Sequence, residues 1–264
     1  MSDLRYSMMD DGCRIAFEYL EQPGAPGLVF SPSLGTSMGL FDAQVQAFSE
    51  RYSILRYDPR GHGASDVAEG SYSHDRLGRD VLQLLDALKI EKAHFAGVSL
   101  GGMTGQWLGY RAPERFLSLT LANTSAYMGP PAGWAERIAT VLANGMEPMV
   151  EPVIERWFTP DFRRENGQEV SRIVSMLKAT SPAGYAGCSA AIRDMDLRRT
   201  ASLIDAPTLV IAGLQDPATP PEHAEFLAQN IAGAKLVSLD AAHLSNVELP
   251  AHFNAALSEF LRGL

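Results

Sequence analysis

One pentapeptide constrains this chain more than any other stretch: the sequence GVSLG at residues 97–101. It follows an apolar run at 93–96 and precedes a helix-like stretch at 102–111. A G-x-S-x-G sequence between a strand and a helix is typical of a nucleophile elbow, a turn so sharp that the serine is strained and its hydroxyl exposed. The flanking glycines remove Cβ atoms that would collide there. The following helix begins with free N–H groups and a positive dipole end, which favour a negative charge beside Ser99.

Strand-like and helix-like patterns alternate along most of the chain. Short apolar runs predict strands at 27–31, 52–57, 93–98, 116–122, 207–213 and 235–239. Helical spacing of apolar residues lies between them, at 40–50, 74–88, 102–111, 221–230 and 250–261. An Asp-Gly pair at 11–12, between the runs 5–9 and 14–20, predicts a hairpin. This order predicts an α/β fold with a mostly parallel central sheet and helices on both faces.

The alternation stops between about residues 125 and 200. That stretch holds helical patterns and no convincing strand, together with Trp134 and Trp157. We interpret it as a helical cap inserted into the core and packed over the sheet. The predicted domains are therefore a core of residues 1–124 and 201–264 and a cap of residues 125–200. A length of 264 residues fits one large α/β domain with such an insertion.

Charge and composition limit the partners of this chain. The formal net charge is −9, which disfavours nucleic acid and anionic membranes as partners. No run approaches the roughly 18 apolar residues of a membrane span, and the first residues lack a signal-peptide core, so we expect a cytoplasmic protein. Cys13 and Cys188 form no metal-ligand cluster and are expected to be buried or idle thiols. No metal cluster, phosphate loop or dinucleotide fingerprint is present in the sequence, so we expect no cofactor.

A serine hydroxyl needs a neighbouring base to become a nucleophile. Three histidines follow Ser99 in the chain, and two of them, His223 and His252, fall within predicted helices and are expected on solvated faces. His243 instead follows the predicted strand 235–239, at the edge of an open α/β sheet where catalytic groups gather. We therefore predict His243 as the base. The upstream His62, in the sequence DPRGHG at 58–63, is interpreted as structural or pocket-lining.

The base in turn needs a carboxylate to orient it. Asp216 follows the strand that ends at Gly213, which places it at the carboxyl end of the sheet. Asp240 is the rival, because it also ends a strand and lies close to His243 in sequence. An orienting carboxylate from the neighbouring strand is more usual when the chain order is serine, acid, histidine, so we prefer Asp216.

Two backbone N–H groups would bind the oxyanion of such a reaction. The residue after the nucleophile supplies one, here Leu100. The loop after the strand 27–31 supplies the other, and Leu34 is our choice within it. Each such donor typically contributes about 3 kcal/mol of transition-state stabilisation.

Together these residues resemble the α/β-hydrolase family over essentially the whole chain. The matching segments, besides the elbow, are SLGT at 33–36, DPRGHGAS at 58–65, LQD at 214–216 and AHLSNVE at 242–248. Within that family the chain is most similar to 3-oxoadipate enol-lactonases, on the SLGT loop, the segment CSAAIRDMDLR at 188–198 and the residues after His243. It departs from them at 31–33, which read Ser-Pro-Ser where an asparagine is expected before the SLGT segment.

The resemblance implies a hydrolase that opens a small anionic lactone through Ser99, His243 and Asp216. The alternatives are a general carboxylesterase or an acyl-homoserine lactonase with the same three residues, with perhydrolase chemistry as a side activity. A receptor that keeps the fold without catalysis is disfavoured by the complete set. A serine at the elbow also argues against dehalogenase and epoxide-hydrolase chemistry, which uses aspartate there.

The cap is expected to set specificity. Trp134 is a candidate wall of the substrate pocket, with packing between cap and core as the alternative. A carboxylate on the substrate needs a local cation in so acidic a protein. Our choice is Arg193, whose apolar neighbours would bury it in part. A solvated helix face, or a salt bridge to Asp194 or Asp196, is the alternative for that side chain, and Arg137 is a second candidate cation.

Overall fold

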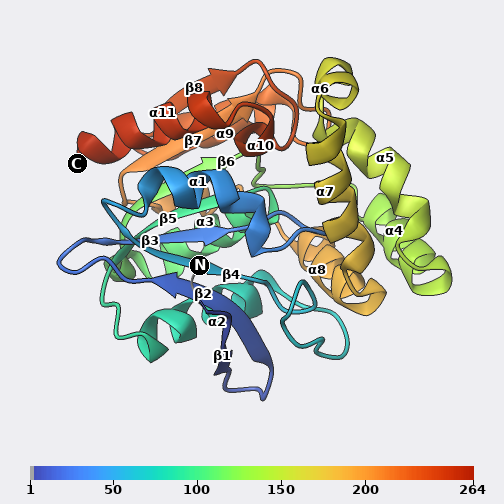
Figure 1. Ribbon diagram of the computed structural model, residues 1–264, viewed down its shortest axis with the longest axis horizontal. Helices are drawn as coiled ribbons and strands as arrows, with labels where there is room; N and C mark the ends of the chain where they lie inside the picture. The colour runs from blue at the N-terminus through green and yellow to red at the C-terminus, as the bar shows by residue number, and fades with distance from the viewer. Residues whose placement is uncertain (1–2) are drawn as a thin grey trace.

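The protein, described here by a computed structural model over residues 3–264, is built on one sheet with helices on both faces (Figure 1). Residues 1 and 2 of the predicted core segment lie outside the described part. The strands are β1 (Arg5–Met8), β2 (Arg14–Leu20), β3 (Gly27–Ser31), β4 (Ser53–Tyr57), β5 (Ala93–Val98), β6 (Phe116–Ala122), β7 (Thr208–Gly213) and β8 (Lys235–Leu239).

The sheet has eight strands in the order β1-β2-β4-β3-β5-β6-β7-β8. β1 pairs with β2, and β2 with β4, in antiparallel register, which confirms the predicted hairpin. All the other pairings are parallel, as the alternation of strands and helices predicts. The carboxyl ends of six neighbouring strands therefore meet at one edge of the sheet, where ligands of open α/β sheets bind.

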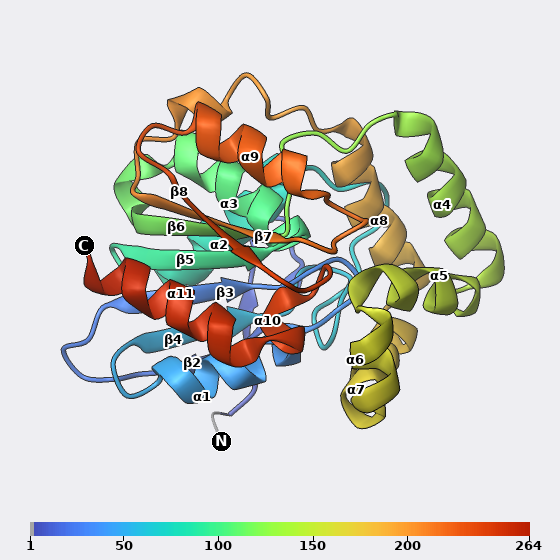
Figure 2. The ribbon, with the colours of Figure 1, turned by 90° about the horizontal axis from the view of Figure 1, so that it is seen from above.

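The helices of the core cover both faces of this sheet. They are α1 (Asp42–Phe48), α2 (His74–Ala87), α3 (Leu100–Arg111), α9 (Pro221–Asn230), α10 (Ser245–Glu248) and α11 (Pro250–Arg262), with 3₁₀ turns η1 (Met38–Phe41), η2 (Pro113–Arg115) and η3 (Ala201–Leu203). α3 and α9 lie on one face and α1 and α11 on the other (Figure 2). η1 and α1 divide the single helix predicted at 40–50, and α10 is too short to give a periodic sequence signal.

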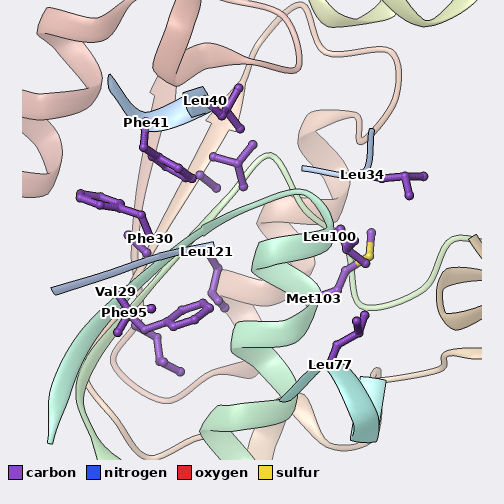
Figure 3. Packing of buried hydrophobic residues seen from close by; sticks show 14 of the residues in the cluster. Val29, Phe30, Leu34, Leu40, Phe41, Leu77, Phe95, Leu100, Met103 and Leu121 are labelled. Atoms are coloured by element: carbon purple, nitrogen blue, oxygen red, sulfur yellow. The ribbon is translucent and has the colours of Figure 1, made fainter. Parts of the chain in front are cut away.

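The parallel strands inside the sheet are largely buried. Every residue of β5 and of β7 is buried, as expected for parallel strands covered on both faces, whose sequences are continuous apolar runs. β8, at the edge, is largely exposed. In Figure 3, Phe30, Phe41 and Phe95 pack beside the strands. Leu34 lies toward Leu100, the first residue of α3. The apolar core thus reaches up to the elbow and holds it in place.

Five helices separate β6 from β7, with no strand among the described residues. They are α4 (Pro131–Asn144), α5 (Glu147–Trp157), α6 (Pro160–Glu165), α7 (Gly167–Ala179) and α8 (Pro182–Asp194), and we call them the cap. The cap lies beyond one end of the sheet (Figures 1 and 2). A helical insertion is thereby confirmed, while its boundaries at 125 and 200 stay a prediction. No helix within residues 3–264 is both long enough and apolar enough to cross a membrane.

Candidate active site

Ser99 lies at the sharp turn between β5 and α3. Its backbone has φ 57° and ψ −113°, a conformation that side-chain-bearing residues rarely adopt. Two hydrogen bonds hold the strained peptide: Ser99 N–H donates to the carbonyl of Ala122 at 2.9 Å, and Thr124 Oγ1 donates to the carbonyl of Ser99 at 2.7 Å. The sheet and the helix together therefore fix the serine.

The two glycines of the pentapeptide are required by close backbone contacts. A Cβ atom on Gly97 would lie 2.3 Å from the backbone of Gly101. A Cβ on Gly101 would lie 2.0 Å from the carbonyl oxygen of Ser31, at the end of β3. Both separations are far inside van der Waals contact, so no other residue fits without a shift of the backbone. The sequence pattern at 97–101 thus follows from the packing of α3 against β3 and β5.

His243 and Asp216 meet across the carboxyl ends of β8 and β7. His243 Nδ1 lies 2.8 Å from Asp216 Oδ2, and both side chains are buried. Because the carboxylate can only accept, Nδ1 carries the proton and Nε2 is the basic nitrogen of the neutral ring. The rival Asp240 is exposed and instead accepts a hydrogen bond from Gln215 at 2.8 Å.

Asp216 is surrounded by donors that hold its charge and its orientation. Its Oδ1 accepts from the N–H groups of Ala218, at 2.7 Å, and Thr219, at 3.0 Å. Its Oδ2 accepts from Thr219 Oγ1 at 2.7 Å and Asn123 Nδ2 at 3.1 Å. Burial by itself raises the pKa of Asp216, but the charge and hydrogen bond of His243, with the bonds from Thr219, outweigh it, so the pKa lies below its ordinary value. Asp216 is therefore ionised at neutral pH.

The loop that carries His243 is tied to the cap. Leu244 N–H donates to the carbonyl of Trp157 at 3.1 Å. The buried carboxylate of Glu248 accepts from Ala242 N–H at 3.0 Å and also from the hydroxyl of Thr159. Trp157 and Thr159 stand at the junction of α5 and α6. The position of His243 consequently depends on cap residues as well as on the sheet.

The two predicted oxyanion donors lie on the loop after β3 and at the start of α3. Leu34 occupies a turn closed by Thr36 N–H, which donates to the carbonyl of Ser33 at 3.1 Å. Leu100 is the first residue of α3, directly after Ser99. Within residues 3–264, neither the N–H of Leu34 nor that of Leu100 has a hydrogen-bond acceptor. Both N–H groups thus lack a protein acceptor in this part of the chain; Leu34 lines the cavity described next, whereas Leu100 does not.

Ser99 and His243 open into one cavity of about 200 Å³ between sheet and cap. Leu34 and Trp134 also line it, so the structure brings four of the predicted site residues to one place. The remaining lining residues are Ser33, Met103, Met128, Arg137, Val153, Arg156, Trp157, Tyr185, Ile192, Pro217, Ala218 and Thr219. The volume suits a small molecule with an apolar body.

The cap contributes two arginines to this cavity, Arg137 and Arg156. The guanidinium of Arg137 lies 4.8 Å from the ring centre of Trp134, and its Nη1 donates to the hydroxyl of Tyr185 at 3.3 Å. Arg156 has no ion pair or side-chain hydrogen bond within the described residues. Burial, and then the like charge of Arg137, lower the pKa of Arg156. The cavity therefore holds two cations that lack a carboxylate partner among residues 3–264.

Arg193 lies outside this cavity. Its guanidinium forms a two-pronged ion pair with the neighbouring Asp194, at 2.7 and 2.8 Å. It is not among the residues that line the cavity, although Ile192, the residue before it, is. The structure thus brings Arg137, the second candidate, to the cavity, and leaves the first choice, Arg193, paired with Asp194 outside it.

The other candidates from the sequence have ordinary positions. His252 is exposed, as expected, whereas His223 is only half-buried on α9 and its Nδ1 is buried with no hydrogen-bond partner within residues 3–264, so the expected solvated face is wrong for His223. Cys13 and Cys188 are expected to be buried or idle thiols, and both are free and buried. Among residues 3–264, no group of three or more histidine, cysteine, aspartate or glutamate side chains could hold a metal ion.

Sequence reasoning missed Asn123 and Arg156. Asn123 directly follows β6, just as other site residues follow their strands. This position after a strand could have marked Asn123 as a candidate site residue. Its Nδ2 supports Asp216, and its Oδ1 accepts from Ser245 Oγ at 2.5 Å. Arg156 follows Val153 by three positions on α5, a spacing that puts both on one helix face. A charge on that apolar face was the available signal.

Comparisons with known proteins agree with this geometry. Residues 26–250 match the profile of the alpha/beta hydrolase fold family. The chain is 41% identical over 241 residues to 3-oxoadipate enol-lactonase 2 of Acinetobacter baylyi, covering 91% of this chain and 90% of that one. A crystal structure of a hydrolase from Pseudomonas aeruginosa PA01 has a TM-score of 0.96 and 47% identity, covering 98% of both chains. The enol-lactonase from Burkholderia xenovorans LB400 has a TM-score of 0.96 and 38% identity, covering 98% of this chain and 100% of that one.

Proposed function

The chain belongs to the alpha/beta hydrolase fold family, and from that premise we propose that it hydrolyses 3-oxoadipate enol-lactone to 3-oxoadipate. The observation that carries the proposal is the content of one cavity. A serine at a strained elbow and a histidine paired with a carboxylate lie in it together with two arginines that lack carboxylate partners among the described residues. Such a site suits an ester that carries a negative charge. The relatives named enol-lactonase support this choice of ester.

In the proposed reaction Ser99 Oγ attacks the lactone carbonyl while His243 Nε2 takes its proton. Asp216 keeps the imidazole in the required tautomer and stabilises its charged form through the 2.8 Å contact. The N–H groups of Leu34 and Leu100 donate to the oxyanion of the tetrahedral intermediate. Each group then has one defined role.

Collapse of the intermediate opens the ring. The bond from the carbonyl carbon to the ring oxygen breaks, and the enolate leaves with a proton from His243. The enol becomes the ketone by tautomerisation. A water molecule, deprotonated by His243, then hydrolyses the acyl-enzyme, which frees Ser99 and creates the second carboxylate of the product.

The cap arginines are the proposed binding site for the carboxylate already present on the substrate. Charge-assisted hydrogen bonds from a guanidinium are stronger than neutral ones and orient a carboxylate. Arg137 and Arg156 take over the role that the sequence prediction gave to Arg193. Trp134 supplies an apolar wall, held by its Nε1–H bond to the carbonyl of Met128 at 2.9 Å. Net attraction is thereby created locally in a protein of overall negative charge.

This activity would place the protein in the breakdown of aromatic compounds, in the β-ketoadipate pathway, and in the cytoplasm. The naming of the Acinetobacter relative supports the substrate, and the free buried cysteines agree with a reducing compartment.

The test is kcat/KM for the enol-lactone, followed by the loss of its ultraviolet absorbance. A series of p-nitrophenyl esters and an acyl-homoserine lactone are measured beside it. We expect about 10⁶–10⁸ M⁻¹s⁻¹ for the enol-lactone and far lower values for the neutral esters. Faster cleavage of alkyl esters would make the protein a general esterase, and no turnover of any ester would leave a binding protein.

A further inference from the structure

His62 is fully buried behind the turn that carries Leu34, and it does not line the cavity. It belongs to the loop after β4, residues 58–65. Gly35 N–H lies 2.9 Å from His62 Nε2, across 27 positions of sequence. The second ring nitrogen, Nδ1, lies 3.2 Å from the carbonyl oxygen of Arg60. Both nitrogens of this ring therefore have backbone partners.

These contacts determine the protonation of the ring. A backbone N–H can only donate, so Nε2 must be unprotonated, and the proton of the neutral ring lies on Nδ1, facing the carbonyl of Arg60. Burial lowers the pKa of His62 to about 4, in keeping with a neutral ring at pH 7. The thiol of Cys188, on α8, also lies beside the ring, with its Sγ 4.0 Å from Nδ1.

The bond from Gly35 acts on a buried turn that is closed on its other side by Thr36, whose N–H and Oγ1 both donate to the carbonyl of Ser33, at 3.1 and 2.8 Å. Gly35 has φ 77°, a left-handed conformation, in the turn closed between Ser33 and Thr36. The same loop holds the segment at a second point, where Asp58 Oδ1 accepts from Met38 N–H at 2.7 Å. His62 is the partner of the peptide directly after Leu34. The bond therefore restrains the peptide unit that adjoins the one carrying the Leu34 N–H.

We propose that His62 is a positioning residue for the oxyanion site: by accepting the Gly35 N–H at Nε2, it aims the neighbouring Leu34 N–H at the oxyanion formed on Ser99. This rests on the proposed role of Leu34. His62 touches neither substrate nor nucleophile and acts only through the turn. An oxyanion donor works mainly in the transition state, so loss of its alignment lowers kcat and leaves KM nearly unchanged.

The first test compares His62→Gln with His62→Met. The two side chains have similar length, but only glutamine offers a strong acceptor near the position of Nε2. We expect His62→Met to lose about 10–100-fold in kcat with KM within about twofold, and His62→Gln to recover most of the loss, since a whole donor is typically worth about 10²–10³-fold. Equal kcat for wild type and both variants would overturn the proposal, as would equal losses in both.

The second test uses the wild-type protein and needs no substitution. In ¹⁵N-labelled protein at pH 7, we expect a through-hydrogen-bond coupling between the Gly35 amide and His62 Nε2, with the ring as the Nδ1–H tautomer. An Nε2–H tautomer would exclude the bond and refute the proposal, even if His62→Met does not fold.

These tests are separable from the choice of substrate. Any ester that Ser99 cleaves forms the same oxyanion, so kcat can be measured with p-nitrophenyl acetate if the enol-lactone is not turned over. If the enol-lactone assay fails, the inference about His62 is still tested by its own two experiments.

Discussion

The two walls of the cavity are built in opposite ways. On the sheet side, the polar groups of the Ser99, Asp216 and His243 set are held by partners from β6, β7 and the following loops. On the cap side, Arg156 has no partner within the described residues, and Arg137 rests on an aromatic ring and a hydroxyl. The polar groups of the catalytic set thus have protein partners, whereas the cap side presents two cations that lack a carboxylate partner within residues 3–264.

This difference separates two tasks. Catalytic groups must stand within a fraction of an ångström of one geometry, so supporting hydrogen bonds and strained backbone are useful there. A cation that binds substrate works best without a protein partner. An arginine that already pairs with a carboxylate has less free energy to gain from binding a substrate carboxylate. We expect substitutions on the sheet side to change kcat or stability and substitutions on the cap side to change KM.

The largest effect should come from Ser99→Ala on the sheet side. Loss of the nucleophile should lower kcat/KM by at least about 10⁴-fold, because the remaining groups cannot form an acyl-enzyme. The melting temperature should move little, since alanine can keep the same backbone. Kinetics and a thermal melt of the two proteins check this. Substantial remaining activity would show that another group is the nucleophile.

Paired glycine substitutions compare the walls in terms of stability. Gly101→Ala should lower the free energy of unfolding by about 3 kcal/mol or more, because the new Cβ would lie 2.0 Å from the carbonyl oxygen of Ser31. Gly133, on the cap helix α4, has open space around it. Gly133→Ala should raise the free energy of unfolding by about 0.5–1 kcal/mol through helix propensity. Urea unfolding of both variants measures the contrast, and similar values would refute it.

The cap arginines give the matching kinetic test. Arg137→Met and Arg156→Met should each raise KM for the enol-lactone about 10–100-fold, the equivalent of a charge-assisted hydrogen bond of about 1.5–3 kcal/mol. Turnover of neutral p-nitrophenyl acetate should change by less than about twofold. Arg193→Met is the control, because Arg193 already pairs with Asp194 outside the cavity. A rise in KM for Arg193→Met alone would restore Arg193 as the binding residue.

The last comparison concerns pH and again distinguishes the two regions, because none of the six histidines lies in the cap. His74, at the start of α2, is buried with both nitrogens unpartnered within the described residues, and burial lowers its pKa to about 4 from 6.5. Between these values the unfolded chain binds a proton that the folded chain does not, so stability falls as pH falls.

From pH 7 to pH 5 this one group should cost about 2 kcal/mol of unfolding free energy. Urea unfolding at the two pH values should show a smaller loss for His74→Leu than for wild type. The exposed His252→Gln serves as control and should lose as much as wild type. An equal loss in His74→Leu would mean that His74 is not the source.

The catalytic groups could be predicted from sequence because each lies shortly after the end of a strand. Runs such as 93–98 and 207–213 are apolar throughout, so their ends are clear, and Ser99 and Asp216 follow them. The cap arginines could not be ranked in this way. Arg156 and Arg193 both stand beside apolar neighbours on helices, and only the packing of α5 and α8 decides which one faces the cavity.

The sequence led to an interpretation of His62 as structural or pocket-lining but could not identify the group that it contacts. Its partner Gly35 is 27 positions away, and hydrogen bonds between two loops leave no periodic signal in either. Asn123 is different, because its place after β6 follows the same rule that identified the acid. Local sequence thus reveals residues whose position is set by their own strand, and hides those whose function depends on a second loop.

The hydrogen bonds between cap and base loop have a consequence for engineering. Trp157 offers its carbonyl to Leu244, and the Thr159 hydroxyl donates to Glu248, on either side of the cap's α5–α6 junction. A cap transplanted from a relative to change specificity would need the same carbonyl position and a hydroxyl at 159, or His243 would lose its support. The cap is therefore not an exchangeable module. Residues 157–159 of this protein should be kept when the rest of the cap is replaced.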